Sequence, residues 1–174
     1  MRTAYFVDGY NVIHSSSLFR GLLRRGAGRA QEELARQVMD FCNAGKADAW
    51  VVFDAYRRND RRMVERLGTH VRMVVTGAGE TADCFIEESV ARIRGHYDYV
   101  YVVTFDYSQV LTVLDEHTLP RSPHLFLQEL HRARSRRRQE YQMAAAASRV
   151  RLTDYLSPDT VKRLRDMAYR TSGR

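Results

Sequence analysis

This 174-residue sequence contains no apolar run long enough to cross a bilayer. Its N-terminus also lacks the charged-then-apolar pattern of a secretory signal peptide. Cysteine is scarce as well, because the chain has only Cys42 and Cys84, which lie far apart and form no CxxC pattern. We therefore expect a cytoplasmic protein that does not contact a membrane and has two reduced, buried thiols.

The signatures of several common catalytic classes are also missing. The six histidines show neither HExxH nor another paired-ligand spacing, which argues against a zinc site. No GxSxG or Cys/His pattern indicates a covalent nucleophile. The stretch GAGETA at residues 77–82 matches a dinucleotide-binding pattern formally, but the acid about 20 residues further on, Asp98, precedes a strand instead of ending one. We expect no nucleotide cofactor.

Lysine is nearly absent, with only Lys46 and Lys162, so the formal charge of +7 comes from arginine. Residues 1–124 hold 16 basic and 16 acidic residues, whereas residues 125–174 hold 12 and 5. A coding bias toward arginine would explain the choice of residue but not why the excess lies at one end. Arginine stacks on bases and grips phosphate with two hydrogen bonds, so this region predicts a contact with RNA.

Short apolar and aromatic runs alternate with helical patterns from residue 3 onward. Such alternation predicts βαβ units and a mostly parallel sheet, and the size of the chain predicts one domain. We expect strands at residues 3–7, 49–53, 71–75 and 99–104, a loop at residues 15–29 and a partly exposed helix at residues 55–68. Further helices are expected at residues 30–43, from Thr81, shortly after Asp106, from Ser122 and from Ser157, the last docking through Val161, Leu164 and Met167.

Aspartates end three of these apolar runs. Asp8 ends the first and precedes Gly9, which permits a sharp turn, while Asp54 and Asp106 end the second and the fourth. Ligands of open α/β sheets bind outside the carboxyl ends of the strands, where these carboxylates converge if the strands are parallel. A single Asp-Gly is also a common turn signal, so the argument depends on the repetition.

A second acidic group opens the helix that begins near Thr81. Glu80 and Asp83 lie in TGAGETADCFIEE, and Glu87 stands one turn after Asp83 on the same face. Two carboxylates at this spacing repel each other unless a cation or solvent relieves them. Since gathered carboxylates hold hard divalent cations, the sequence predicts Mg²⁺ or Mn²⁺ at the acidic edge.

The chemistry expected of such an edge is hydrolysis at phosphorus. A divalent ion activates water and stabilises the leaving oxygen of a phosphodiester, and two ions about 3.5 to 4 Å apart divide these tasks. Three uncharged residues are candidates for supporting roles. Asn11 and Gln109 would bond a phosphate or a metal-bound water, and Thr104 would orient Asp106.

Four stretches together resemble the YacP-like branch of the NYN domain family: VDGYNVIH, VVFDAY, TGAGETADCFIE and VVTFDYSQ. The likeness continues through RSPHLFLQEL and LSPDTVKRLRDMAYR, and so covers nearly the whole chain. It implies an α/β fold, namely a PIN-like three-layer sandwich with a mostly parallel central sheet and a C-terminal helical extension. It also implies a metal-dependent endoribonuclease, in a family that includes ribosome-associated enzymes that cut mRNA.

The resemblance also assigns the metal site. It maps the family's acidic positions onto Asp8, Asp83 and Asp106, with Asp54 and Glu80 as further candidates. One position departs from the family pattern, because a small hydroxyl residue usually precedes the last aspartate and this chain has Phe105. A hydrogen bond made from that position is therefore not expected here.

The sequence thus predicts one nuclease domain over residues 1–174, with an acidic edge that cuts single-stranded RNA, including mRNA on the ribosome. Its basic helical part, from about residue 122 onward, would hold the RNA through Arg132, Arg134, Arg136, Arg137 and Arg138. One alternative is a non-catalytic RNA- or ribosome-binding module in which the carboxylates only cap turns. Another is a metal-dependent phosphatase for small substrates, for which the basic part would be superfluous.

Overall fold

The computed structural model describes residues 1–55, 61–106, 115–155, 157, 159–160 and 162–163. Contacts divide the chain into two compact units, residues 1–134 and residues 135–174. The first unit holds the sheet and the helices that cover it, and the second holds the rest of the last long helix. That the whole chain is one domain stays a prediction.

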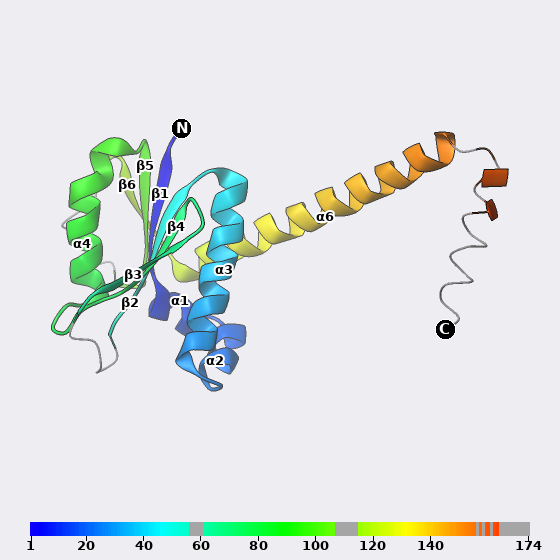
Figure 1. The fold of residues 1–174 in the computed structure, drawn as a ribbon. Helices are drawn as coiled ribbons and strands as arrows, with labels where there is room; N and C mark the ends of the chain where they lie inside the picture. Colours follow the sequence, from blue (N-terminus) through cyan, green and yellow to red (C-terminus); the bar gives the residue numbers. More distant parts are fainter. Residues whose placement is uncertain (56–60, 107–114, 156, 158, 161, 164–174) are drawn as a thin grey trace. The chain divides into compact units, whose positions relative to one another are not determined.

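Six strands form one sheet in the first unit (Figure 1). They are β1 (Thr3–Asp8), β2 (Asp48–Phe53), β3 (Met63–Leu67), β4 (Val71–Val75), β5 (Tyr99–Val103) and β6 (Thr118–Arg121). Their order is β3-β4-β2-β1-β5-β6, and neighbouring strands run parallel except β3 and β4, which run antiparallel. The mostly parallel sheet expected from the alternating elements is confirmed, with β1 in its interior.

Helices cover both faces of this sheet (Figure 1). One face packs on α4 (Ala82–Ile93), and the other packs on α3 (Ala27–Gly45) and the first turns of α6 (Pro123–Tyr155). The shorter helices are α1 (Gly9–Ser15), α2 (Ser17–Leu23) and the 3-10 helix η1 (Arg94–His96). This arrangement confirms the three-layer α/β sandwich.

Alternation along β1 assigns its side chains to two separate cores. Phe6 lies in the core on the α4 side, whereas Tyr5 and Val7 lie in the core on the α3 side. Successive residues of a strand point to opposite faces, so a strand covered on both sides needs a continuous apolar run. The first apolar run of the sequence is continuous in this way, and Asp8 lies at the end of the buried strand that it forms.

The helix expected at residues 30–43 is the central part of α3. Leu34, Val38 and Cys42 recur at helical spacing and are fully buried. The helix continues to Gly45, because Lys46 and not Gly45 follows its end in the left-handed conformation (φ 51°). Cys84 is exposed on α4, which corrects the expectation of two buried thiols.

Two segments of the first unit differ from prediction. The expected loop at residues 15–29 contains α2, because the Ser16 hydroxyl accepts a hydrogen bond from the Phe19 amide (3.5 Å) and the Phe19 ring is buried. The expected helix at residues 55–68 is in part a strand, since β3 pairs with β4, while residues 56–60 lie outside the described residues. Four of the five residues of β3 are exposed, so this edge strand lacks the alternating burial by which a strand is recognised.

The edge strand β6 was not predicted either. It has four residues and contains Pro120, which has no amide hydrogen to donate. Proline is tolerated at a sheet edge because the outer side of an edge strand has no neighbour to receive that bond. A short strand with proline gives little signal in a sequence.

The long C-terminal helix begins where the sequence places it. The Ser122 hydroxyl accepts a hydrogen bond from the Leu125 amide (3.2 Å), and Pro123 is the first helical residue. Phe126 and Leu130 pack into the core of the first unit, whereas residues 134–147 are all exposed. The short helix expected after Asp106, and Val161, Leu164 and Met167, lie outside the described residues. None of the helices described is long and apolar enough to cross a membrane.

Candidate active site

The aspartates that end β1 and follow β2 and β5 stand at one edge of the sheet. The three strands are adjacent and parallel, and their register pairs Asp8 with Val52 and Val7 with Val103. Asp54 and Asp106 therefore each lie about two residues beyond the level of Asp8 on the neighbouring strands. The register thus brings the carboxyl ends of these strands together at the edge where ligands of α/β sheets bind.

Asp8 is both the last residue of β1 and the N-cap of α1. Its Oδ1 accepts a hydrogen bond from the Asn11 amide nitrogen (2.9 Å), and its Oδ2 accepts one from Asn11 Nδ2. Burial raises the pKa of Asp8 above its usual range, hydrogen bonds from Asn11 oppose this rise, and the charge of Asp54 adds to it. Asn11, which was expected to bond a phosphate or water, thus holds Asp8.

Asp83 has the most anionic surroundings among the candidates. It lies in the first turn of α4, where the Thr81 hydroxyl caps the helix by accepting a hydrogen bond from the Cys84 amide (3.2 Å). Burial, and then the charges of neighbouring carboxylates, raise the pKa of Asp83 to about 6. Those carboxylates belong to Asp8, Asp54, Asp106 and Glu87. The structure therefore brings Asp83 close to three of the other candidate ligands.

Asp54 connects two elements of the site. Its Oδ1 accepts a hydrogen bond from the amide of Ala82 (2.5 Å), the first residue of α4. A neighbouring bond, from the Ala55 amide to the buried Thr76 hydroxyl (3.0 Å), fixes the chain just after Asp54. Sequence reasoning missed Thr76, whose contact depends on the pairing of β2 with β4.

Asp106 follows a similar anchor at the end of β5. Thr104 is fully buried, and its hydroxyl accepts a hydrogen bond from the Asp106 amide (3.0 Å). The Thr104 amide in turn donates to the Arg121 carbonyl at the end of β6 (3.3 Å). Thr104 thus contacts the backbone of Asp106, and its role in orienting the carboxylate stays a prediction.

Glu80 is engaged by a basic residue. Its carboxylate pairs with Arg62, and its Oε2 also accepts a hydrogen bond from the Gly77 amide (3.0 Å). The hydrogen bond from Arg62 holds the pKa of Glu80 below its usual range. The Arg62 guanidinium also lies over the Phe85 ring, with its Cζ 4.9 Å from the ring centroid. Glu80 therefore braces the loop before α4, a contact that sequence reasoning missed because Arg62 lies 18 residues away.

The donor set suits a hard divalent cation, although the side chains are not gathered around one. Among the described residues, no group of three or more His, Cys, Asp or Glu side chains is arranged so that it could hold a metal ion. Mg²⁺ keeps several waters and is usually bound through only one or two carboxylates plus phosphate oxygens of the substrate. The excess of carboxylates around Asp83 fits that mode of binding in charge and in ligand type.

The remaining candidates are on α6 or outside the described residues. Gln109 falls in the undescribed segment 107–114. The arginines expected to bind RNA are exposed on α6, and they are Arg132, Arg134, Arg136, Arg137 and Arg138. Of these, only Arg132 and Arg134 belong to the first unit.

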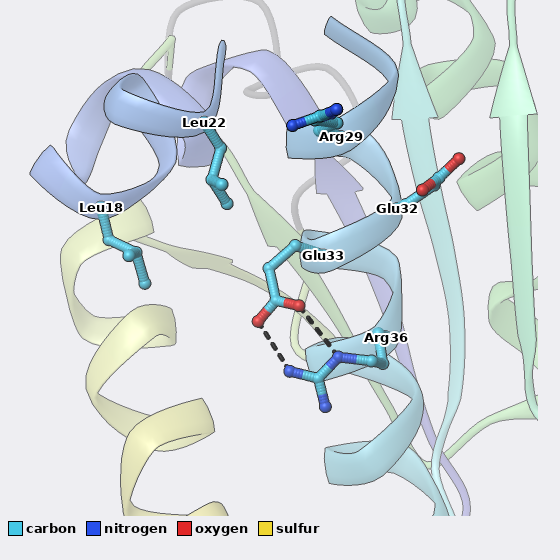
Figure 2. Close-up of a pocket in the computed structure, with 6 residues that line it drawn as sticks. All are labelled: Leu18, Leu22, Arg29, Glu32, Glu33 and Arg36. Atoms are coloured by element: carbon cyan, nitrogen blue, oxygen red, sulfur yellow. Dashed lines mark hydrogen bonds and ion pairs between the residues drawn. The ribbon is translucent and has the colours of Figure 1, made fainter. Parts of the chain in front are cut away.

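A pocket of about 450 Å³ lies along α2 and α3, and the acidic candidates are not among its lining residues (Figure 2). It is lined by Leu18, Leu22, Arg29, Glu32, Glu33 and Arg36. Its Glu33 carboxylate already accepts hydrogen bonds from Arg36 Nε (2.9 Å) and Nη2 (2.6 Å) (Figure 2). Chemistry at phosphorus is therefore better supported at the acidic edge.

A mostly parallel sheet between helical layers, with carboxylates at its carboxyl edge, defines a PIN-like α/β domain. Domains of this class are generally nucleases that use divalent metal ions. The chain belongs to the YacP-like NYN domain family, whose sequence model matches residues 5–169. The family resemblance found in the motifs is thus confirmed.

Two crystal structures of Rae1 (YacP) from Bacillus subtilis share the fold. One, of a tryptophan-to-leucine mutant, is 24% identical with a TM-score of 0.63, and the match covers 89% of this chain and 85% of that chain. The other is 20% identical with a TM-score of 0.66, and the match covers 98% of this chain and 95% of that chain. None of the curated proteins matches this sequence.

Proposed function

We propose that this protein is a metal-dependent endoribonuclease that hydrolyses phosphodiester bonds of single-stranded RNA. The observation that best supports the proposal is the charge of the carboxylates near Asp83, which adds to burial in raising the pKa of Asp83 to about 6. Like charges held this close cost free energy, and a bound cation removes that cost. Membership of a family with a PIN-like fold supports the same activity.

In this proposal Asp8, Asp83 and Asp106 hold Mg²⁺ or Mn²⁺, with Asp54 as a further ligand. When bound, such an ion activates water and neutralises charge that develops at phosphorus. The hydrogen bonds from Asn11 hold the Asp8 carboxylate in place before any ligand arrives. Thr104 does the same for the backbone of Asp106, and Gln109 is proposed to bond the substrate.

Glu80 has a different role in the proposal. Its pairing with Arg62 and its bond from Gly77 make it a brace for the loop that presents Asp83. It becomes a ligand only if the pair with Arg62 opens. The proposed metal site is therefore centred on aspartates.

The acidic edge repels RNA, so the proposal gives the grip on RNA to the exposed arginines of α6. Neutralising Z phosphates of a single strand gives a log-log salt slope of about −0.7Z. We further propose that the protein acts in the cytoplasm and that its substrate is mRNA presented by the ribosome. A ribosome-bound strand would be held close to the protein, so the arginines need supply only part of the affinity.

The decisive experiment is cleavage of a long single-stranded RNA with Mg²⁺ or Mn²⁺, with and without translating ribosomes. Wild type is compared with Asp8→Asn and with Glu88→Gln, which changes an exposed carboxylate on α4 that pairs with Arg92. Internal cuts that require the metal and Asp8, but not Glu88, are the expected result. If wild type and Asp8→Asn are equally inert in every condition while both bind RNA, the enzyme proposal fails.

One observation favours the rival function, a non-catalytic RNA- or ribosome-binding module. Asp8 caps α1 and Asp54 accepts a hydrogen bond from the first residue of α4, so both carboxylates have a structural role that needs no metal. This rival predicts that Asp106→Asn leaves RNA binding intact and that Mg²⁺ does not change the thermal unfolding midpoint. Thermal unfolding with increasing Mg²⁺ therefore separates the two functions without an activity assay.

A further inference from the structure

Phe105 exposes an aromatic ring beside the acidic edge. Its side chain is 44% exposed, although Thr104 before it is fully buried and Asp106 after it is half-buried. The ring is thus directed outward at the position that immediately precedes a candidate metal ligand. An apolar surface in this place is available to a substrate that approaches the carboxylates.

The backbone and a neighbouring ring fix the position of this side chain. Hydrogen bonds from the Thr104 amide to the Arg121 carbonyl (3.3 Å) and from the Asp106 amide to the Thr104 hydroxyl (3.0 Å) hold the chain on both sides of Phe105. The ring of His124, in the first turn of α6, meets the Phe105 ring in a T-shaped contact (5.4 Å, 67°). Such support lowers the entropy that a ligand would lose on ordering the ring.

The charge of this edge explains why an uncharged contact matters here. Asp8, Asp83 and Asp106 repel the phosphates of a nucleic acid, and the Arg62 guanidinium is already paired with Glu80. Apart from phosphate oxygens bound to a metal ion, affinity next to these carboxylates is best supplied by contacts that do not depend on phosphate charge. Stacking of a nucleobase on an aromatic ring is such a contact, and it tolerates any base because every base has a π face.

We propose that Phe105 is a stacking platform for one nucleobase next to the phosphate that is cut. The location of the cut rests on the proposed nuclease function, whereas the stacking itself does not. Phe105 binds and positions the strand and takes no part in proton transfer. The His124 ring braces the platform from the side.

The test combines one protein change with one RNA change. RNAs that are identical except for a single abasic nucleotide, placed at each position in turn, are bound in Mg²⁺ to proteins that all carry Asp8→Asn to keep the RNA intact. The proteins have Phe, Ala or Trp at residue 105. Val64→Ala serves as the control, because Val64 is 55% exposed on the far edge strand β3.

Phe105→Ala is expected to weaken binding of intact RNA about 5- to 150-fold, the range of one base stacked on an aromatic ring. One abasic position should weaken binding by a similar factor when Phe105 is present, and by almost nothing in Phe105→Ala. Phe105→Trp should keep the affinity, and Val64→Ala should change nothing. A purely structural role predicts that Trp and Ala fail alike, with a lowered unfolding midpoint.

The outcomes separate this inference from the nuclease proposal. If every abasic site weakens the Phe105 and Phe105→Ala proteins equally, or if no RNA is bound, the stacking platform is overturned. If coupling to one base is found but the wild type never cuts RNA, the nuclease proposal fails and the platform stands. If the wild type cuts RNA and no base couples to Phe105, only the platform fails.

Discussion

The ring of Phe53 occupies the space in which a side chain at Gly9 would lie. A Cβ atom at residue 9 would overlap Phe53 Cε1, and the Phe53 ring is fully buried and packs edge to face on Tyr10 (5.4 Å). The sequence suggested a sharp turn at Gly9. In the structure Gly9 begins α1 directly after Asp8, and glycine is needed there because the Phe53 ring at the end of β2 fills the space of a Cβ atom.

Gly9→Ala is therefore expected to lower the free energy of unfolding by about 1 to 3 kcal/mol, because the Phe53 ring must move. Gly21→Ala in α2 is the matched control, since no atom lies within 4 Å of the added Cβ. That change should raise the free energy of unfolding by about 0.5 to 1 kcal/mol through helix propensity. Urea-induced unfolding measures both changes, and equal losses would contradict the steric explanation.

Asp83 should make stability depend on pH in an unusual direction. Its pKa is about 6 in the folded protein against an ordinary value of 3.8, so the folded state binds this proton more tightly than the unfolded state. Stability from this group therefore falls as pH rises from about 4 to about 6 and is constant above that range. Asp83→Asn should raise the unfolding midpoint at about pH 8 and leave it nearly unchanged below about pH 4. Thermal unfolding across this range is the measurement, and a midpoint gain that is equal at both ends would refute the charge argument.

A divalent cation should stabilise the protein through the aspartates and not through Glu80. At ten times its dissociation constant, a bound ion adds about 1.4 kcal/mol to the free energy of unfolding. Asp83→Asn should lose most of this gain, whereas Glu80→Gln should keep it, because Glu80 is already paired with Arg62. Thermal unfolding with increasing Mg²⁺ or Mn²⁺ tests both variants. Loss of the gain in Glu80→Gln alone would move the metal site to the loop before α4.

Asp48 should contribute stability that acid removes. It begins β2 at the amino ends of the parallel strands, opposite the acidic site. There its carboxylate contacts His70 Nδ1 (3.0 Å) and accepts a hydrogen bond from the Tyr97 hydroxyl (2.8 Å). Burial raises the pKa of Asp48, but the hydrogen bonds from His70 and Tyr97 outweigh burial and hold it below 3.8. This stability is complete above the unfolded pKa and is lost as pH falls through the folded pKa.

Asp48→Asn should accordingly cost about 1 to 2 kcal/mol at neutral pH, and the cost should shrink in acid. Tyr97→Phe removes one of the two contacts and should cost less at neutral pH. Urea-induced unfolding at about pH 7 and about pH 3 provides the comparison. A cost for Asp48→Asn that does not vary with pH would mean that packing, and not charge, is responsible.

Replacing Arg136, Arg137 and Arg138 together by Ala should flatten the salt dependence of RNA binding. If each arginine neutralises one phosphate, the log-log slope changes by about 2. Arg20, Arg24 and Arg25 form the control triple, since they are exposed and carry the same charge in the first unit. Stabilisation by metal should be the same in both triples. If only the control triple flattens the slope, the grip on RNA lies near α2.

The parallel part of the fold was predictable because buried strands need continuous apolar runs. Residues 71–75 were placed to the residue, and β1, β2 and β5 to within one residue at either end. The edge strands were missed because β3 and β6 bury too little of their side chains to produce a pattern. The capped helix α2 was missed because serines lead into it and it contains Gly21, and both residue types are typical of loops.

The acidic site was predictable to the extent that it follows from strand order. Parallel strands bring Asp8, Asp54 and Asp106 to one edge, and this could be inferred from where each apolar run ends. The pairing of Glu80 with Arg62 and the steric demand of Phe53 on Gly9 depend on side chains from other elements. Nothing in the local sequence at Glu80 or Gly9 reports such contacts.

The hydrogen bond from the Ala82 amide to Asp54 Oδ1 means that a cation bound through that oxygen would compete with the N-terminus of α4. A cation that draws the Asp54 carboxylate away leaves that amide to water, and the first turn of the helix, with Asp83 in it, is then free to shift toward the ion. Binding of the cation and movement of the first turn of α4, which carries Asp83, would then be coupled. Amide hydrogen exchange at Ala82 would therefore report on metal binding before any RNA is cut.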